Sequence, residues 1–217
     1  MTIAVEILAA YDGFGERRTG GAGDAAAAIW LNTRATATGA EARLEPVDFN
    51  RTAERAGGIL AWLAALEALA AMPTRRRRVV ALATCGHELG HIGAHRAFAA
   101  EPALASASAL VLHLGANLGC SGDARLTVRS NVAGLAARMA AALVAAGHPA
   151  APLDVVTGGT ANGEAHEIAS RGGRYLSLIG NNPWFHAPED RWPGSIDLAR
   201  TSAIARAVAA IAAAEAA

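Results

Sequence analysis

Residues 78–95 read RVVALATCGHELGHIGAH, and the first part of this stretch decides the fold. The continuous apolar run at 78–84 has the length of a strand, and such runs are typical of strands covered on both faces of a sheet. Gly86 follows it and permits a tight turn. The sequence therefore predicts a buried strand that ends in a turn presenting His87 and Glu88.

Helical and strand patterns alternate along the rest of the chain. The patterns predict helices over 2–11, 23–38, 54–72, 91–100, 132–147 and 164–171 and from about 196, with further strands over 42–49, 107–115, 152–157 and 173–180. This alternation predicts an α/β fold, a three-layer α/β/α sandwich with a mainly parallel, mixed central sheet. No repeat or long linker divides residues 1–217, so we expect a single domain whose active groups collect on loops beyond the strand ends.

Composition excludes some classes of partner. The formal net charge is zero, which removes the usual electrostatic argument for nucleic acid. No apolar run approaches the ~20 residues of a membrane span, and the start of the chain lacks a basic leader, so we expect a cytoplasmic protein with no membrane partner. Cys85 and Cys120 are expected to be reduced thiols. The alanine-rich helices are compatible with a homo-oligomer and equally with core packing.

His87, Glu88 and His91 form a complete His-Glu-x-x-His string. In zinc metalloproteases the two histidines of this motif bind the metal from one helix, and the glutamate acts as the base. Here a predicted strand runs into the string, with Gly86 at the turn. A helical site of that kind would require residues 87–91 to be helical, so this third interpretation is weaker than the two functions given at the end of the sequence analysis.

Two stretches resemble a known family. VVALATCGHELGHIGAHRAF (79–98) and WFHAPEDRW (184–192) are similar to segments of the di-zinc aminopeptidases, which include leucyl aminopeptidases and glutaminyl cyclases. In that family a buried strand ends at Gly-Glu-Glu-Leu-Gly, and the histidine of a Tyr-His-Thr-Pro-Glu-Asp loop binds zinc. RRTGGAGDAAAAIWL (17–31) also looks like the lead-in of bacterial members. The resemblance spans nearly the whole chain and implies a zinc-aminopeptidase-like fold.

The resemblance implies an altered set of zinc ligands. His186 matches the zinc-binding histidine, Glu88 matches a ligand, His87 stands at the general-base position, and Glu54 lies close to the bridging aspartate. The family's His-x-Asp pair has no counterpart, and its Asn-Leu-Asp ligand segment aligns with residues 113–115, which lack the carboxylate. We therefore expect one zinc ion rather than two, or none.

Other groups near the predicted strand ends could complete the site. His91 and His113 are candidate metal ligands, because zinc accepts imidazole nitrogens. Candidate substrate-binding residues are Glu164, His166, Trp184 and Phe185. His87 could act as the base, since an imidazole titrates near neutral pH, or it could be a ligand that leaves Glu88 as the base.

Two functions of different classes follow from these features. The first is a metal-dependent hydrolase that cleaves an amide or peptide bond in a small peptide or an amino-acid-like substrate. The alternative is a non-catalytic aminopeptidase-like domain with a decayed metal site that binds a small ligand or a partner protein. Stoichiometric metal is expected only for the first.

Overall fold

A computed structural model describes most of the chain. The described residues are 2–15, 21–44, 57–122, 124–151, 153–185, 187 and 189–217. Glu54 and His186, two of the predicted zinc ligands, lie outside them, as do residues 45–49 of one predicted strand.

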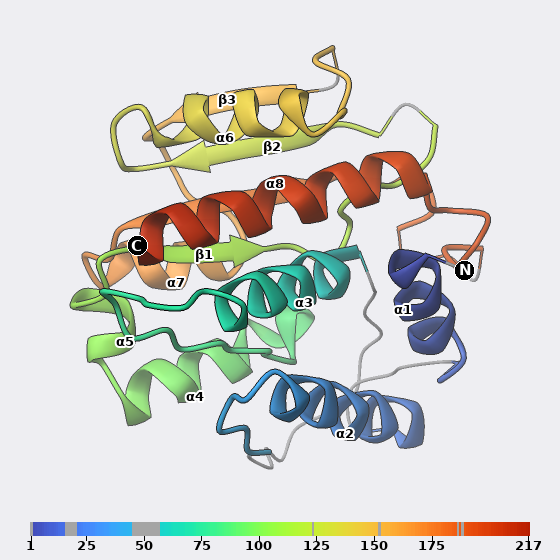
Figure 1. Cartoon of the computed structure of the whole chain (residues 1–217), viewed down its shortest axis with the longest axis horizontal. Helices are drawn as coiled ribbons and strands as arrows, with labels where there is room; N and C mark the ends of the chain where they lie inside the picture. The colour runs from blue at the N-terminus through green and yellow to red at the C-terminus, as the bar shows by residue number, and fades with distance from the viewer. Residues whose placement is uncertain are drawn as a thin grey trace.

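The described residues form an α/β structure around a mixed four-stranded sheet (Figure 1). The strands lie in the order β1-β4-β2-β3, with bounds β1 (Val111–Leu114), β2 (Leu126–Ser130), β3 (Leu153–Thr157) and β4 (Tyr175–Gly180). β1 runs parallel to β4 and β2 runs parallel to β3, whereas β2 and β4 are antiparallel. Two of the three strand pairs are thus parallel, as the predicted mixed sheet requires.

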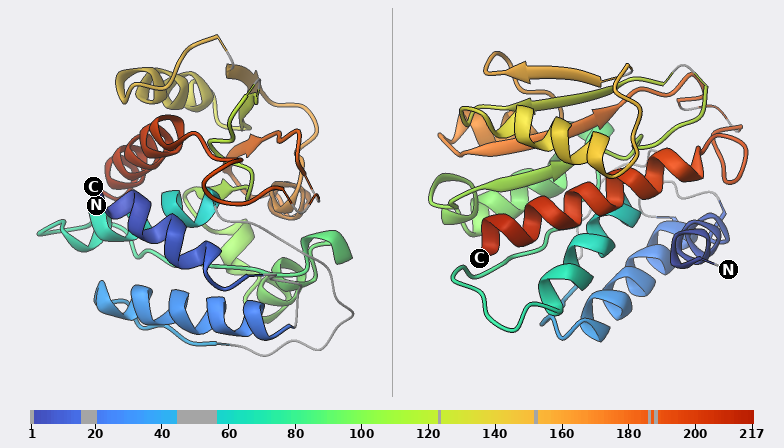
Figure 2. Two further views of the ribbon diagram at one scale, coloured as in Figure 1. Left: turned by 90° about the vertical axis from the view of Figure 1, so that its right-hand side faces the viewer. Right: turned by 45° about the horizontal axis from the view of Figure 1, so that its top comes forward.

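Helices cover both faces of this sheet (Figure 2). Their bounds are α1 (Ile3–Asp12), α2 (Ala22–Ala37), α3 (Gly57–Ala70), α4 (Ile92–Ala100), α5 (Ala103–Ser106), α6 (Leu135–Ala145), α7 (Glu164–Ser170) and α8 (Leu198–Ala216). The largest apolar core joins α3, α6 and α8 to one face. A smaller core joins α4, α5 and α7 to β1 and β4. α1 and α2 pack outside the sheet, against α3.

Along the two central strands, β2 and β4, successive side chains point alternately to the two faces of the sheet. Val128 of β2 and Leu178 of β4 are fully buried in the large core. Their neighbours Thr127, Arg129 and Ser177 project to the opposite face, because successive side chains of a strand point to opposite sides. The second face therefore carries polar groups beside α7, and it is the face on which the candidate site is built.

Most predicted elements are present, with ends shifted by a few residues. The helices near 2–11, 23–38, 54–72, 91–100, 132–147 and 164–171 and the C-terminal helix are confirmed, as are the strands within 107–115, 152–157 and 173–180. The sequence patterns did not identify β2 or the short helix α5. Of the predicted strand at 42–49, the described residues 42–44 are irregular.

The prediction of a buried strand at 78–84 is wrong. These residues have no regular secondary structure and are exposed, with Val80 46% accessible. Within the described chain, the preceding arginines are held at helix ends instead: the amide of Arg76 donates to the Ala216 carbonyl at 3.0 Å, and Arg77 pairs with Glu215 at 3.7 Å. Apolar residues gave the run its strand-like pattern, but a strand also needs a neighbouring strand to pair with, and residues 78–84 pair with no strand among the described residues.

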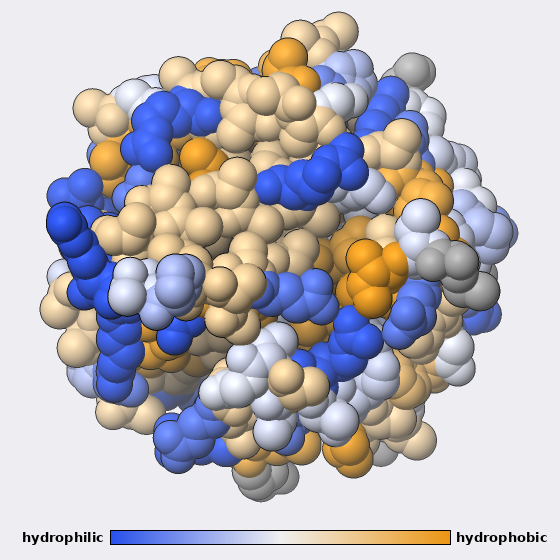
Figure 3. Space-filling view, viewed as in Figure 1, coloured by the Kyte–Doolittle hydropathy of each residue, from blue (hydrophilic) through white to orange (hydrophobic). Residues whose placement is uncertain are grey.

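The outer surface is rich in small apolar groups. Figure 3 shows pale orange side chains over much of the face that carries α8 and α6, interrupted by hydrophilic residues. None of the helices among the described residues combines the length and apolar character needed to cross a membrane. The predicted homo-oligomer stays a prediction.

His148 makes the stability of the fold dependent on pH. Burial lowers the pKa of this ring below 6.5, and the charge of Arg200 lowers it further. The hydrogen bond to the Pro149 carbonyl and the charge of Asp197 raise the pKa, but they do not offset the effect of burial. The folded protein therefore favours the neutral ring. The contribution of the neutral His148 ring to the free energy of unfolding is fully present above about pH 6.5, the pKa in the unfolded state. It is lost as the pH falls through the lower pKa of the folded state.

We expect the free energy of unfolding in urea to be smaller at pH 5.5 than at pH 7.5, and part of this difference to disappear in His148→Asn. Asparagine keeps an N–H near the position of Nδ1, which lies 2.8 Å from the Pro149 oxygen. An equal pH dependence in both proteins would show that His148 is not responsible.

Candidate functional site

A sharp turn between residues 86 and 91 positions two histidines. Gly86 and Gly90 have φ values of 73° and 76°, and a short 3-10 turn, His87–Leu89, lies between them. His91 has a φ of 58°, and among the described residues it is the non-glycine residue with positive φ. Such a backbone costs on the order of 1–2 kcal/mol and is often found at functional sites. The turn places the rings of His87 and His91 4.9 Å apart.

Glu164 joins this pair from the N-terminus of α7. Its carboxylate oxygens lie 3.0 and 3.1 Å from Nδ1 of His87. One ligand atom from each of His87, His91 and Glu164 lies within 4.8 Å of the other two, so the three side chains are close enough together to hold one metal ion. All three side chains are half-buried. We call these three residues the histidine–glutamate cluster.

His113 holds Glu164 from the sheet. Its Nε2 lies 3.3 Å from Oε2 of Glu164, and its Nδ1 lies 2.8 Å from the Ser177 hydroxyl. A carboxylate only accepts hydrogen bonds, so Nε2 donates to it, and a neutral ring then accepts the Ser177 hydroxyl proton at Nδ1. The sheet thereby fixes the orientation of Glu164 through His113.

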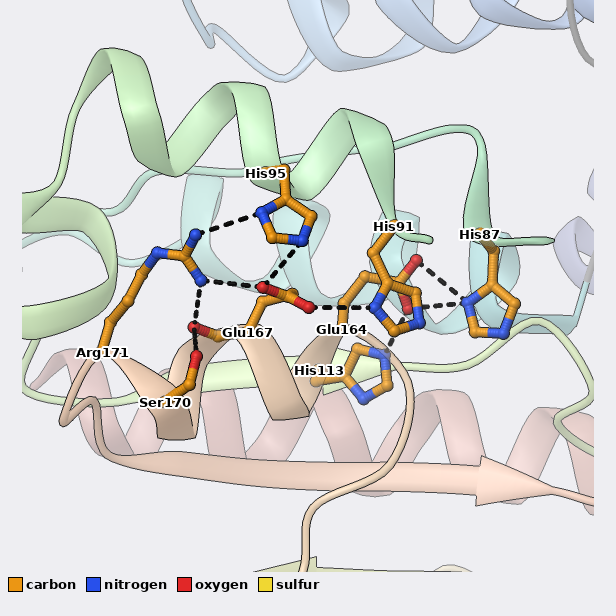
Figure 4. Close-up of polar contacts among 8 residues, drawn as sticks. All are labelled: His87, His91, His95, His113, Glu164, Glu167, Ser170 and Arg171. Atoms are coloured by element: carbon orange, nitrogen blue, oxygen red, sulfur yellow. Dashed lines mark hydrogen bonds and ion pairs between the residues drawn. The ribbon is translucent and has the colours of Figure 1, made fainter. Parts of the chain in front are cut away.

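Glu167 holds His91 in a similar way (Figure 4). Its Oε1 lies 3.2 Å from Nδ1 of His91, while its Oε2 receives Arg171 at 2.8 Å and lies 3.2 Å from Nε2 of His95. Glu167 is only 6% exposed, so this carboxylate is enclosed by its donors. Because Nδ1 of His91 donates to it, Nε2 of a neutral His91 keeps its lone pair for a metal ion, a common arrangement of metal-binding histidines.

Both carboxylates of α7 are kept ionised. Burial by itself raises the pKa of Glu164, but hydrogen bonds from His113 and His87 and the charges of those rings outweigh it and hold the pKa well below its usual value. For Glu167, burial is likewise outweighed by Arg171, His91 and His95, so its pKa is also lowered. An ionised carboxylate is the form that binds a cation.

The cluster suits zinc in its chemistry. Two imidazole nitrogens and one carboxylate oxygen are a common ligand set of catalytic zinc sites, in which the fourth position stays open for water or substrate. The side chain of His87 is 41% exposed, so the cluster is accessible from solvent on that side. Of the groups of three or more potential ligands among the described residues, this cluster is the one that the geometry assembles.

The remaining predicted residues lie elsewhere. Glu88 is exposed on the 3-10 turn and is not a member of the cluster, and His166 is exposed on α7. Trp184 is half-buried and Phe185 is 49% exposed, both in the loop after β4. Cys85 and Cys120 form no disulfide within the described part of the chain and are not members of the cluster.

Three contributing residues were not identified from the sequence: Glu167, Ser177 and His95. Glu164 and Glu167 are spaced to share one face of a helix, as are His91 and His95. The presence of these two spacings, one of glutamates and one of histidines, was the signal in the sequence that could have identified Glu167 and His95. Ser177 carried no signal, because its contact with His113 depends on the pairing of β1 with β4.

The helical zinc-motif interpretation is not supported by the backbone. Residues 87–91 do not form a continuous α-helix, since left-handed residues interrupt the segment on both sides of the 3-10 turn. The two histidines of the motif nevertheless meet in one site, and their third partner comes from α7 rather than from the motif.

Comparison with protein-family models, with curated proteins and with solved structures finds no match. The aminopeptidase-like assignment therefore depends on the quoted sequence motifs alone, and the site has to be interpreted from its own geometry.

Proposed function

We propose that this protein is a zinc-dependent hydrolase of an amide or peptide bond in a small peptide or an amino-acid-like substrate. The observation that supports the proposal is the histidine–glutamate cluster, three ligand groups within 4.8 Å of one another on an accessible surface. In this proposal His87, His91 and Glu164 hold a single ion. The zinc-aminopeptidase-like fold is part of the same proposal.

Each residue would have a distinct task. A bound zinc ion would polarise the substrate carbonyl and lower the pKa of a water molecule. His113 and Glu167 would be positioning residues, since they hold Glu164 and His91. Glu88, next to His87 on the same turn, is the candidate base, so His87 is assigned as a ligand. This division of labour follows that of the His-Glu-x-x-His enzymes.

The proposal is tested by zinc-dependent turnover. Protein freed of metal by a chelator should not cleave a panel of dipeptides and N-acetylated amino acids, and addition of one equivalent of zinc should restore cleavage. Stoichiometric zinc without turnover of any member would favour the non-catalytic alternative, and absence of zinc binding would contradict the proposal altogether.

Glu88→Gln should retain the zinc affinity of the wild type and lose about 10²-fold or more in turnover, a typical effect of removing a general base. Glu101→Gln is a matched control, because Glu101 is an exposed glutamate that pairs with Arg78 at 3.2 Å. Full turnover in Glu88→Gln would remove Glu88 from the mechanism without affecting the assignment of the ligands.

Glu167→Gln should lower zinc affinity about 10- to 100-fold, the usual effect of changing a residue that orients a metal ligand. The amide is close in size to the carboxylate but lacks its negative charge, which attracts the side chains of His91, His95 and Arg171. Competition with a chelating indicator measures the affinity, and Glu189→Gln, at an exposed position, is the control. Equal affinities in the two variants would contradict the positioning role.

A further inference from the structure

A row of side chains crosses the sheet from the cluster. His113 of β1 lies directly opposite Ser177 of β4, and Ser177 lies directly opposite Arg129 of β2. Residues opposite one another project from the same face of a sheet. Since neighbouring strands are about 4.8 Å apart, the backbones of His113 and Arg129 are separated by about 10 Å. The row links the metal-binding cluster to a cationic side chain.

A hollow lies at the Arg129 end of this row. It encloses about 260 Å³, counted with the part open to solvent, and its lining is Thr127, Arg129, Asn162, Ser177 and Ile179. Ser177 belongs both to this hollow and to the cluster's support, because its hydroxyl contacts His113. Asn162 stands two residues before Glu164. The hollow therefore adjoins residues that support the candidate site, and its lining carries hydroxyl, amide and guanidinium donors.

The guanidinium of Arg129 has capacity for an anion. Its Nη1 donates to the Gly158 carbonyl at 2.7 Å, and within the described part of the chain no carboxylate pairs with it. Arg125, which immediately precedes β2, differs in this respect, because its Nε donates to Asp154 at 2.9 Å. One of two similar arginines is neutralised by the protein, and the other is half-buried at the hollow with its charge uncompensated among the described residues.

A carboxylate is an anion that matches the donors of this hollow. The planar guanidinium fork matches the two oxygens of a carboxylate, and the Thr127 hydroxyl and the Asn162 amide offer further donors. Ser177 and Asn162 bring this hollow close to the cluster, because Ser177 contacts His113 and Asn162 precedes Glu164 by two residues, so a short substrate suits the two sites.

We propose that Arg129, with Thr127 and Asn162, binds the free carboxylate of the substrate. The substrate class is then an N-acylated amino acid or a short peptide cleaved at its last residue. In the reaction, the oxygen of water bonds to the acyl carbon, the carbon–nitrogen bond breaks, and the released nitrogen takes up a proton. The products are a carboxylic acid and a free amino acid. This inference rests on the proposed hydrolase function.

The test uses a matched pair of probes, N-acetyl-L-alanine and N-acetyl-L-alaninamide, which differ in the carboxylate. Binding to zinc-loaded protein is measured by calorimetry. Wild-type protein should bind the acid at least about 10-fold more tightly than the amide, since a charge-assisted pair is the stronger hydrogen bond. Arg129→Gln should lose this preference, and Arg129→Lys, which keeps the charge but not the fork, should retain part of it.

Arg125→Gln is the control, and it should keep the preference of the wild type. Zinc content is measured for every variant and should not change. A preference retained in Arg129→Gln, lost equally in Arg125→Gln, or absent from zinc-loaded wild type would overturn the inference. If the wild type binds no zinc but shows an Arg129-dependent preference for the acid, the hydrolase proposal fails and the carboxylate site stands.

Discussion

Glu164→Gln is expected to lower zinc affinity by more than about 10²-fold, beyond the range usual for residues that only orient a ligand. Glu164 is the carboxylate of the cluster. Both of its oxygens face His87, and Oε2 also accepts a hydrogen bond from Nε2 of His113. The amide of glutamine is neutral, so the ion loses its anionic ligand. Competition against a chelating indicator, with wild type and variant in parallel, measures this difference.

The same change should remove most of the stabilisation by zinc. Zinc at about 1,000 times its dissociation constant would add roughly 4 kcal/mol to the free energy of unfolding of the wild type, because only the folded chain offers the assembled site. The control is His166→Asn, an exposed position on α7. It should be stabilised like the wild type. Zinc stabilisation retained in Glu164→Gln would remove Glu164 from the ligand set.

Gly57→Ala is expected to lower the free energy of unfolding by about 3 kcal/mol, at the upper end of the usual cost of overpacking. A Cβ at Gly57 would lie 2.1 Å from the Leu118 carbonyl oxygen and 3.0 Å from that of Ala116, so backbone would have to move. Helix α3 begins at this glycine and packs against the segment that follows β1.

Urea unfolding measures this loss, with Gly194→Ala as the control. At Gly194 the nearest atom to an added Cβ, the Arg191 oxygen, is 3.9 Å away, so the change should stay within about 0.5 kcal/mol. Similar unfolding free energies for the two variants would show that α3 can shift without loss of packing.

The sequence predicted elements well where one face is consistently apolar. α6 and α8 have apolar residues at helical spacing that enter the main core, and β4 has a run of buried residues. β2 was missed because only every other residue is buried, and its second face carries Thr127 and Arg129. The run at 78–84 shows the reverse case, in which apolar residues stay exposed and unpaired with any described strand.

The candidate site could be predicted only in part. His87, His91, His113 and Glu164 were all candidates, but no pattern indicated that His87 meets Glu164, which is 77 residues away along the chain. Glu88 was placed in the metal site because it follows His87. On a 3-10 turn successive side chains point about 120° apart, so Glu88 does not join its neighbour His87 as a second ligand of the same ion. Ser177 acts through a tertiary contact with His113 that no local pattern encodes.

The most direct test is X-ray absorption spectroscopy at the zinc edge, on protein carrying its measured complement of metal. We predict about one zinc per chain, with two imidazole nitrogens and carboxylate oxygen at about 2.0–2.2 Å and no sulfur at about 2.3 Å. His87→Ala should lose one imidazole from this spectrum or lose the ion. A chain that takes up no zinc, a sulfur-containing ligand shell, or a spectrum unchanged in His87→Ala would contradict the assignment of the histidine–glutamate cluster as the metal centre.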